Sequence, residues 1–228
     1  MEIKRIVVCG DSFCTEHPPL PNTHFSELLG SKYNYEVTNL AWPGMSNTAI
    51  CFQIEQAIKL NPDFVIFANT DVSRIDIPTK KFETGRGLKN FVYSYDNNLG
   101  AKAEYVGGRT ANVYSNTIPS FLDSRPDLPD SVLQNNELIK AIKYYVNFLF
   151  DYEFNAQTNE WMIGYWVYKL KEHNIQHLWI NRDPMWEIIN KFIRNNPDEI
   201  GKVTYHTDPS AQLELTEKIK EYIDKISS

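Results

Sequence analysis

Three segments of strand length, two of them apolar and one alternating, lie within the first 75 residues, and the first two lead through turns into helical patterns. They occupy residues 3–9, 35–40 and 64–68, with Ile6-Val7-Val8 at the centre of the first. Strands that alternate with helices in this way favour a parallel sheet with helices on its faces. A further strand is predicted at 177–180. The sequence therefore predicts an α/β fold, with three α/β/α layers around a central parallel sheet.

Helical periodicity and turn residues divide the rest of the chain. Helices are expected at 23–29 with Gly30 as the stop, at about 46–60, at 136–150, at 159–172 after a break near 155–157, at 184–194 and at 210–228. Residues 76–135 lack a strong helical period and are rich in Gly, Pro, Asn and Ser. We interpret them as an insertion with a hairpin, lying as a lid over the sheet's carboxyl edge within a single domain of residues 1–228.

Charge and cysteine content narrow the class of protein. The formal net charge of -6 argues against a nucleic-acid partner, and no run approaches the roughly 18 apolar residues of a membrane span. Three cysteines (Cys9, Cys14 and Cys51) without metal-ligand spacing indicate free thiols in a reducing compartment. With no apolar signal region at the start, the sequence predicts a cytoplasmic protein. The aromatic residues of the 76–135 insertion allow for a homo-oligomer interface.

The tripeptide Gly10-Asp11-Ser12 stands where the first strand would turn toward the next helix. A serine at such a turn presents its hydroxyl outside the sheet, with its backbone N–H beside the start of the helix. An acyl-transfer nucleophile needs that pairing of an exposed hydroxyl with an oxyanion donor. A polar turn without chemistry would carry the same residues, so Ser12 is a hypothesis on these residues alone. Cys14 is a rival nucleophile.

Three more polar segments follow predicted strands or precede the last helix. Pro43-Gly44 forms a turn at which glycine permits close approach of a ligand. Asn69 follows the third strand, at the edge where open parallel sheets bind ligands. His206 and Asp208 lie in the loop before the last helix. With Gly10-Asp11-Ser12, they make four blocks in a fixed order.

This order of blocks resembles the SGNH (GDSL-type) hydrolase superfamily over roughly residues 1–75 and 175–228. The resemblance implies that family's flavodoxin-like sheet and Ser12 as the nucleophile. It also implies an oxyanion hole made by the Ser12 N–H, the Gly44 N–H and the Asn69 side-chain amide. The family's Gly-x-Asn-Asp becomes Ala68-Asn69-Thr70-Asp71 here, with the asparagine displaced by one position.

The last block departs from the family, which places an aspartate three residues before a histidine. Here His206 comes two residues before Asp208, and three arrangements stay open. His206 is the base and Asp208 orients it, since a triad is defined by geometry and not by chain order. Alternatively, Asp208 faces Ser12 directly, as a poor base unless burial raises its pKa. In the third arrangement His17 or His24 is the base, or the site only binds.

The first functional hypothesis is a serine hydrolase that cleaves a carboxylic ester through an acyl-enzyme. Its substrate would be a small-molecule or carbohydrate ester with a small acyl group, such as acetyl on a sugar or polyol. A second hypothesis is a catalytically weak or inactive binding protein that retains the oxyanion pocket, and a third is acyl transfer to an acceptor other than water. No cofactor is required, and the scattered carboxylates of residues 71, 76, 96 and 123 give no metal-ligand spacing.

Overall fold

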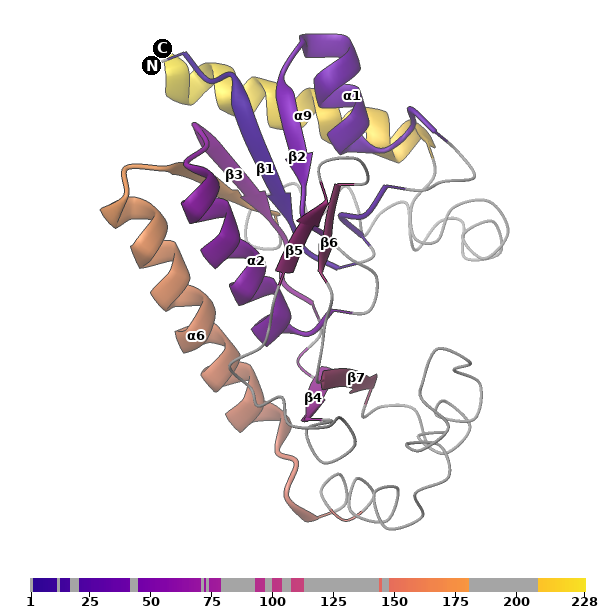
Figure 1. Cartoon of the computed structure of the whole chain (residues 1–228), viewed down its shortest axis with the longest axis vertical. Helices are drawn as coiled ribbons and strands as arrows, with labels where there is room; N and C mark the ends of the chain where they lie inside the picture. The colour runs from indigo at the N-terminus through magenta and orange to yellow at the C-terminus, as the bar shows by residue number, and fades with distance from the viewer. Residues whose placement is uncertain are drawn as a thin grey trace.

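The computed structural model has an α/β fold built on a parallel sheet (Figure 1). It describes residues 2–11, 13–16, 21–41, 45–70, 72, 74–78, 93–96, 100–103, 108–112, 144, 148–180 and 209–228. The sheet contains β1 (Arg5–Cys9), β2 (Glu36–Asn39), β3 (Phe64–Phe67) and β8 (Gln176–Trp179), in the order β2-β1-β3-β8. Every neighbouring pair is parallel. The carboxyl ends of the four strands therefore meet at one edge.

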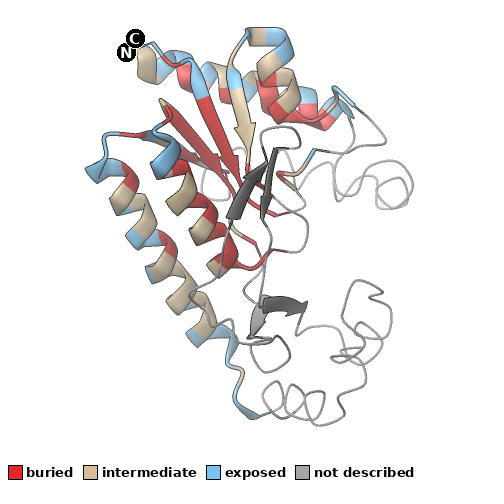
Figure 2. Ribbon diagram, in the orientation of Figure 1, coloured by how far each residue is buried: buried red, intermediate tan, exposed pale blue. Residues whose placement is uncertain are grey.

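Helices cover both faces of this sheet (Figure 1), which confirms the three-layer arrangement. Helices α1 (Phe25–Tyr33) and α9 (Pro209–Ser227) pack on one face. Helices α2 (Asn47–Leu60) and α6 (Tyr152–Glu172) pack on the other. All of β3 is buried (Figure 2), because a central strand covered on both faces has no side that meets water.

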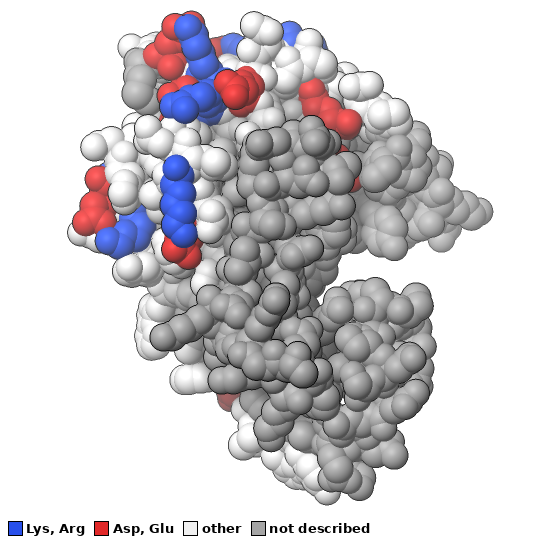
Figure 3. Space-filling model, in the orientation of Figure 1, with Lys and Arg blue, Asp and Glu red and all other residues white. Residues whose placement is uncertain are grey.

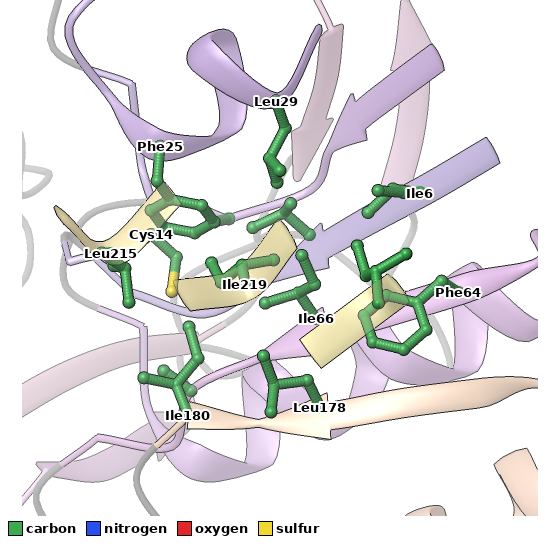
Figure 4. Close-up of a cluster of buried hydrophobic side chains, with 14 of the residues drawn as sticks. Ile6, Cys14, Phe25, Leu29, Phe64, Ile66, Leu178, Ile180, Leu215 and Ile219 are labelled. Atoms are coloured by element: carbon green, nitrogen blue, oxygen red, sulfur yellow. The ribbon is translucent and has the colours of Figure 1, made fainter. Parts of the chain in front are cut away.

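The alternation of side chains along the strands separates two apolar cores. Ile6 and Ile66 face α1 and α9, whereas Val7 and Val65 face α2 and α6. Figure 4 shows the first core, where Phe25 of α1 and Ile219 of α9 lie among the strand side chains. Burying each large aliphatic or aromatic side chain contributes about 1.5–3 kcal/mol to the stability of the fold. The two cores therefore stabilise the sheet and the edge at which the carboxyl ends of its strands meet.

Two helix boundaries differ from the sequence-based expectation. Gly30 does not stop α1, which continues to Tyr33 and ends at Asn34 in a left-handed conformation (φ 59°). Asparagine adopts that conformation more readily than most side chains and so supplies the C-cap. The break expected near 155–157 is also wrong, since α6 begins at Tyr152. The Asp151 side chain accepts a hydrogen bond from the Phe154 N–H (2.7 Å), so the polar residues form the capped first turn.

Two antiparallel strand pairs follow β3 in the sequence. Strand β4 (Arg74–Pro78) pairs with β7 (Gly108–Asn112), and β5 (Tyr93–Asp96) pairs with β6 (Gly100–Ala103). The β5–β6 pair confirms the hairpin expected within 76–135. The role of this segment as a lid and the single-domain boundaries stay predictions. The helix expected at 136–150 lies largely outside the described residues, and the one at 184–194 lies wholly outside them.

Within the described ranges, no helix is both long and apolar enough to cross a membrane. Basic and acidic side chains lie beside one another on the described part of the face seen in Figure 3. Ion pairs within helices mix the two signs in the same way, such as Lys59 with Glu55 (2.9 Å) and Lys169 with Glu172 (2.6 Å).

Candidate active site

Polar residues gather where the four parallel strands end. Gly10 and Asp11 follow β1, Asn39 is the last residue of β2, Asn69 and Thr70 follow β3, and Trp179 is the last residue of β8. In open parallel sheets this edge binds ligands because the loops after the strands converge there. Hydrogen bonds join several of these residues to one another and to α2, and we refer to this bonded set as the frame.

Gly10 begins the frame, at a position that only glycine fits. Its φ of 155° is one that other residues rarely adopt, and a Cβ there would lie 2.6 Å from the Cys14 Sγ. The fully buried Gln53 side chain of α2 bonds both backbone groups of Gly10. Its Oε1 accepts from the Gly10 N–H (2.6 Å), and its Nε2 donates to the Gly10 carbonyl (3.1 Å). Helix α2 thus fixes the start of the turn.

Asp11 ties the turn to the end of β3. Its Oδ1 accepts the Phe13 N–H (3.0 Å), which closes an Asx turn across position 12. Its Oδ2 accepts the Thr70 hydroxyl (2.7 Å), and both residues are buried. The buried Asn47 side chain holds Thr70 in turn, accepting its N–H (2.8 Å) and donating to its carbonyl (3.0 Å). Helix α2 therefore holds Thr70 at the end of β3, Thr70 holds Asp11, and Asp11 holds Phe13 on the other side of position 12.

Asn69 lies half-buried next to this frame. Its Oδ1 accepts the Trp179 indole N–H (2.7 Å), and its Nδ2 donates to the Thr70 carbonyl (3.3 Å). Because an indole N–H is only a donor, this bond fixes which end of the Asn69 amide is oxygen and which is the NH₂ donor. The Trp179 ring packs on Phe67 with centroids 5.4 Å apart. Both ends of the Asn69 amide are thus held by neighbouring residues, with the NH₂ end on the Thr70 carbonyl.

His24 holds the 13–16 loop against α1. Its Nδ1 accepts the Ser26 N–H (3.3 Å) as the N-cap of α1 and lies 2.8 Å from the Ser26 Oγ. The proton is thereby placed on Nε2, which lies 3.2 Å from the Phe13 carbonyl and donates to it. Both ring nitrogens are engaged in local structure, which favours a capping role for His24 over that of a general base.

Asn39 and Glu16 complete the contacts of this loop. The Asn39 Nδ2 donates to the Cys14 carbonyl (2.8 Å) and to the Ser26 Oγ (3.2 Å). The Ser26 Oγ also lies 3.5 Å from the Glu16 carboxylate. Burial, followed by repulsion from Glu27, raises the pKa of Glu16. The end of β2 is therefore joined to the same loop as the end of β1.

The cysteines are three buried free thiols. Burial raises the pKa of Cys14 well above its usual value, and the nearby Asp11 carboxylate raises it further. A thiol that is 1% exposed and protonated is not a nucleophile at neutral pH. The rival nucleophile is therefore rejected, and Cys14 is part of the apolar core.

Of the residues that the sequence proposes for catalysis, the structure describes Asn69, the alternative base His24 and the rival nucleophile Cys14. Ser12, Gly44, His206, Asp208 and the alternative base His17 lie outside the described residues. Within the described part of the chain, no group of three His, Cys, Asp or Glu side chains is arranged to hold a metal ion.

Four members of the frame were not proposed as site residues from the sequence: Gln53, Asn47, Thr70 and Trp179. Gln53 carried a signal that could have been used. It stands among the apolar positions of α2, next to Ile54, and a polar residue on a buried helix face must find a partner. Thr70 follows the strand end directly, where its hydroxyl could have been considered beside Asn69. Trp179 was interpreted from the sequence only as an apolar residue of the strand at 177–180.

No family model matches this chain, and no curated protein matches it. Among solved structures, a similar one is that of a candidate lipolytic protein of the G-D-S-L family from Desulfitobacterium hafniense DCB-2. It is 14% identical, and the comparison covers 94% of this chain and 96% of that chain with a TM-score of 0.35. At this level of similarity the comparison carries no argument about function, which has to be argued from the chain's own residues.

Proposed function

We propose that this protein is a serine hydrolase that cleaves a small carboxylic ester through an acyl-enzyme. Ser12 attacks the carbonyl carbon, its proton passes to a base, and the alcohol leaves with that proton. Water, activated by the same base, then attacks the acyl-enzyme and releases the acid. The small acyl group, such as acetyl on a sugar or polyol, follows from the breadth of the SGNH superfamily that the sequence blocks resemble.

The observation that carries this proposal is the pair of hydrogen bonds accepted by Asp11. They join the Phe13 N–H and the Thr70 hydroxyl on the two oxygens of one buried carboxylate. A nucleophile must be held in a fixed position for attack, and misplacing it is costly in rate. A turn that needed only to connect a strand to a helix would not require three buried polar side chains from two other elements.

The oriented Asn69 supports an oxyanion hole at the same edge. In this proposal its Nδ2 joins the Ser12 N–H and the Gly44 N–H around the developing oxyanion. Removing one such donor typically reduces kcat by about 10²–10³-fold. The bond from Trp179 engages Oδ1, the acceptor end of the amide, which supports a donor role for Nδ2.

For the base we propose His206, oriented by Asp208. His24 is a weaker candidate because both of its ring nitrogens bond local groups. The pH dependence of kcat/KM separates the two arrangements of the last block. The ordinary pKa of a histidine is about 6.5, and that of an aspartate is about 4. Loss of activity below about pH 6.5 supports His206, and activity that persists to about pH 4 supports Asp208 as the base.

A second candidate function is that of a binding protein on the same scaffold. The reversed order of His206 and Asp208, relative to the superfamily, favours it. Such a protein would hold a carbonyl or an anion at the oxyanion pocket without turnover, since a fold can persist after its chemistry is lost.

Labelling with a fluorophosphonate probe distinguishes these functions, because the probe reacts only with an activated serine. The modified residue is located by peptide mass spectrometry in the wild type, in Ser12→Ala and in the matched control Ser31→Ala. Ser31 is an exposed serine on α1. The hydrolase proposal predicts labelling at Ser12 that is lost in Ser12→Ala and kept in Ser31→Ala. No labelling of the wild type would leave the binding protein as the better account.

A further inference from the structure

Helix α6 has two apolar faces, and only one of them packs on the described part of the protein. Ile163 and Leu170 are buried in the core shared with α2. Four aromatic side chains point away from that core: Phe154 (65% exposed), Trp161 (66%), Tyr165 (53%) and Tyr168 (60%). We refer to these four as the aromatic stripe. Figure 1 shows α6 on the outside of the molecule, so a partner could reach it.

Three of the four stripe residues are spaced symmetrically about Trp161. Phe154 lies seven residues before Trp161, and Tyr168 lies seven residues after it. At about 100° per residue, the four side chains fall within an arc of about 60° on the helix. When two such helices lie antiparallel with Trp161 at the two-fold axis, Phe154 meets the partner's Tyr168. A stripe with this symmetry is complementary to itself, as a two-fold interface requires.

We propose that α6 is a homodimer interface, in which the aromatic stripes of two copies of this chain pack antiparallel. The charges of the helix fit this orientation. Glu153 lies in its first turn and Lys171 near its end, on the same edge of the stripe. Antiparallel packing brings Glu153 near the partner's Lys171 and also opposes the two helix dipoles favourably. A parallel pair would leave Glu153 and Lys171 at opposite ends of the interface, without this pairing.

The expected affinity follows from the area available. Four aromatic side chains of about 150–250 Å² each, about 60% exposed, offer roughly 400–600 Å² per protomer. Stable interfaces bury about 800 Å² per partner. The dimer is therefore weak and reversible, and it forms at high protein concentration. A membrane surface is the less favoured occupant because Asp151 and Glu153 would face the anionic headgroups.

Sedimentation velocity of the full chain over a concentration series tests the interface. We expect the weight-average mass to rise from monomer toward dimer, and Trp161→Glu to weaken association at least tenfold. Leu213→Glu is the matched control, since Leu213 is an exposed apolar residue on α9 (43%). If Trp161→Glu unfolds the chain, Glu153→Lys is used instead. It should weaken association, and the double variant Glu153→Lys/Lys171→Glu should restore it. Monomer at every concentration would overturn the proposal.

Cysteine cross-linking tests the orientation, and the buried native thiols should not interfere. An antiparallel pair predicts that Phe154→Cys and Tyr168→Cys form a disulfide-linked dimer when mixed, and that neither does so alone. Cross-linking of each single variant with itself would show a parallel pair and contradict the proposal. A monomer that instead binds vesicles of 3:1 phosphatidylcholine and phosphatidylglycerol through the stripe would also contradict it. None of these outcomes depends on whether Ser12 is catalytic.

Discussion

The Thr70 hydroxyl is the link between the end of β3 and the turn that follows β1. Thr70→Val keeps the shape of the side chain and removes the donor to the Asp11 carboxylate. We expect a loss of about 1–3 kcal/mol in the free energy of unfolding, because the acceptor is a buried charged group. Thr216→Val is the matched control, since that buried hydroxyl bonds only its own helix at the Gln212 carbonyl (2.7 Å).

Urea denaturation with a constant m-value measures both variants. Fluorophosphonate labelling of Thr70→Val should also be slower than that of the wild type, because the turn loses a support. If Thr70→Val and Thr216→Val lose the same stability and label at the wild-type rate, the link has no special role.

In the proposed reaction, Trp179 orients Asn69 by donating its indole N–H to the Asn69 Oδ1. Trp179→Phe removes the indole donor but keeps a ring that can pack on Phe67. We expect kcat to fall about tenfold with little change in KM, and Asn69→Ala to fall by about 10²–10³-fold. Steady-state kinetics with p-nitrophenyl acetate measures both, with Trp166→Phe on α6 as the control. A wild-type kcat in Asn69→Ala would remove this residue from the oxyanion hole.

At the scale of elements, two glycines should respond to alanine with opposite signs. Gly30 lies inside α1, where an added Cβ would meet only the Tyr35 carbonyl at 3.5 Å. Gly30→Ala should stabilise the protein by about 0.5–1 kcal/mol because alanine favours the helix. Gly10→Ala should cost about 2–4 kcal/mol, because its φ is unsuited to alanine and its Cβ would collide with Cys14.

Thermal or urea unfolding of the two glycine variants measures both changes in the free energy of unfolding. Destabilisation by Gly30→Ala would mean that this residue ends a helix, as the sequence pattern first indicates. A neutral effect of Gly10→Ala would mean that the turn after β1 is not held rigidly by Gln53 and Cys14.

The sheet could be predicted from the sequence because its physics is local. A strand covered on both faces must be apolar throughout, and Phe64–Phe67 is. Helix ends were less predictable, because Gly30 and Asn34 both suit a C-cap and only packing decides between them. The break expected near 155–157 failed for a similar reason, since Asp151 could cap the helix and the sequence did not reveal which polar residue would do so.

The frame of the candidate site could not be predicted, because its hydrogen bonds join residues far apart in the chain. Gln53 bonds Gly10 across 43 positions, and Thr70 bonds Asp11 across 59. No periodicity or short motif encodes such pairs. Motif order could name Ser12 and Asn69 as candidates, while the packing of α2 and β3 against β1 determines what supports them.

For the whole molecule, we propose that this chain is an esterase in which Ser12 is the nucleophile. The most direct measurement is p-nitrophenyl acetate turnover at pH 8 by the wild type, Ser12→Ala, His206→Ala and Asp208→Ala. We predict that Ser12→Ala and His206→Ala each lose about a thousandfold or more in kcat. Turnover by the wild type that is no faster than that of Ser12→Ala, together with no labelling of Ser12 by the fluorophosphonate probe, would contradict this account.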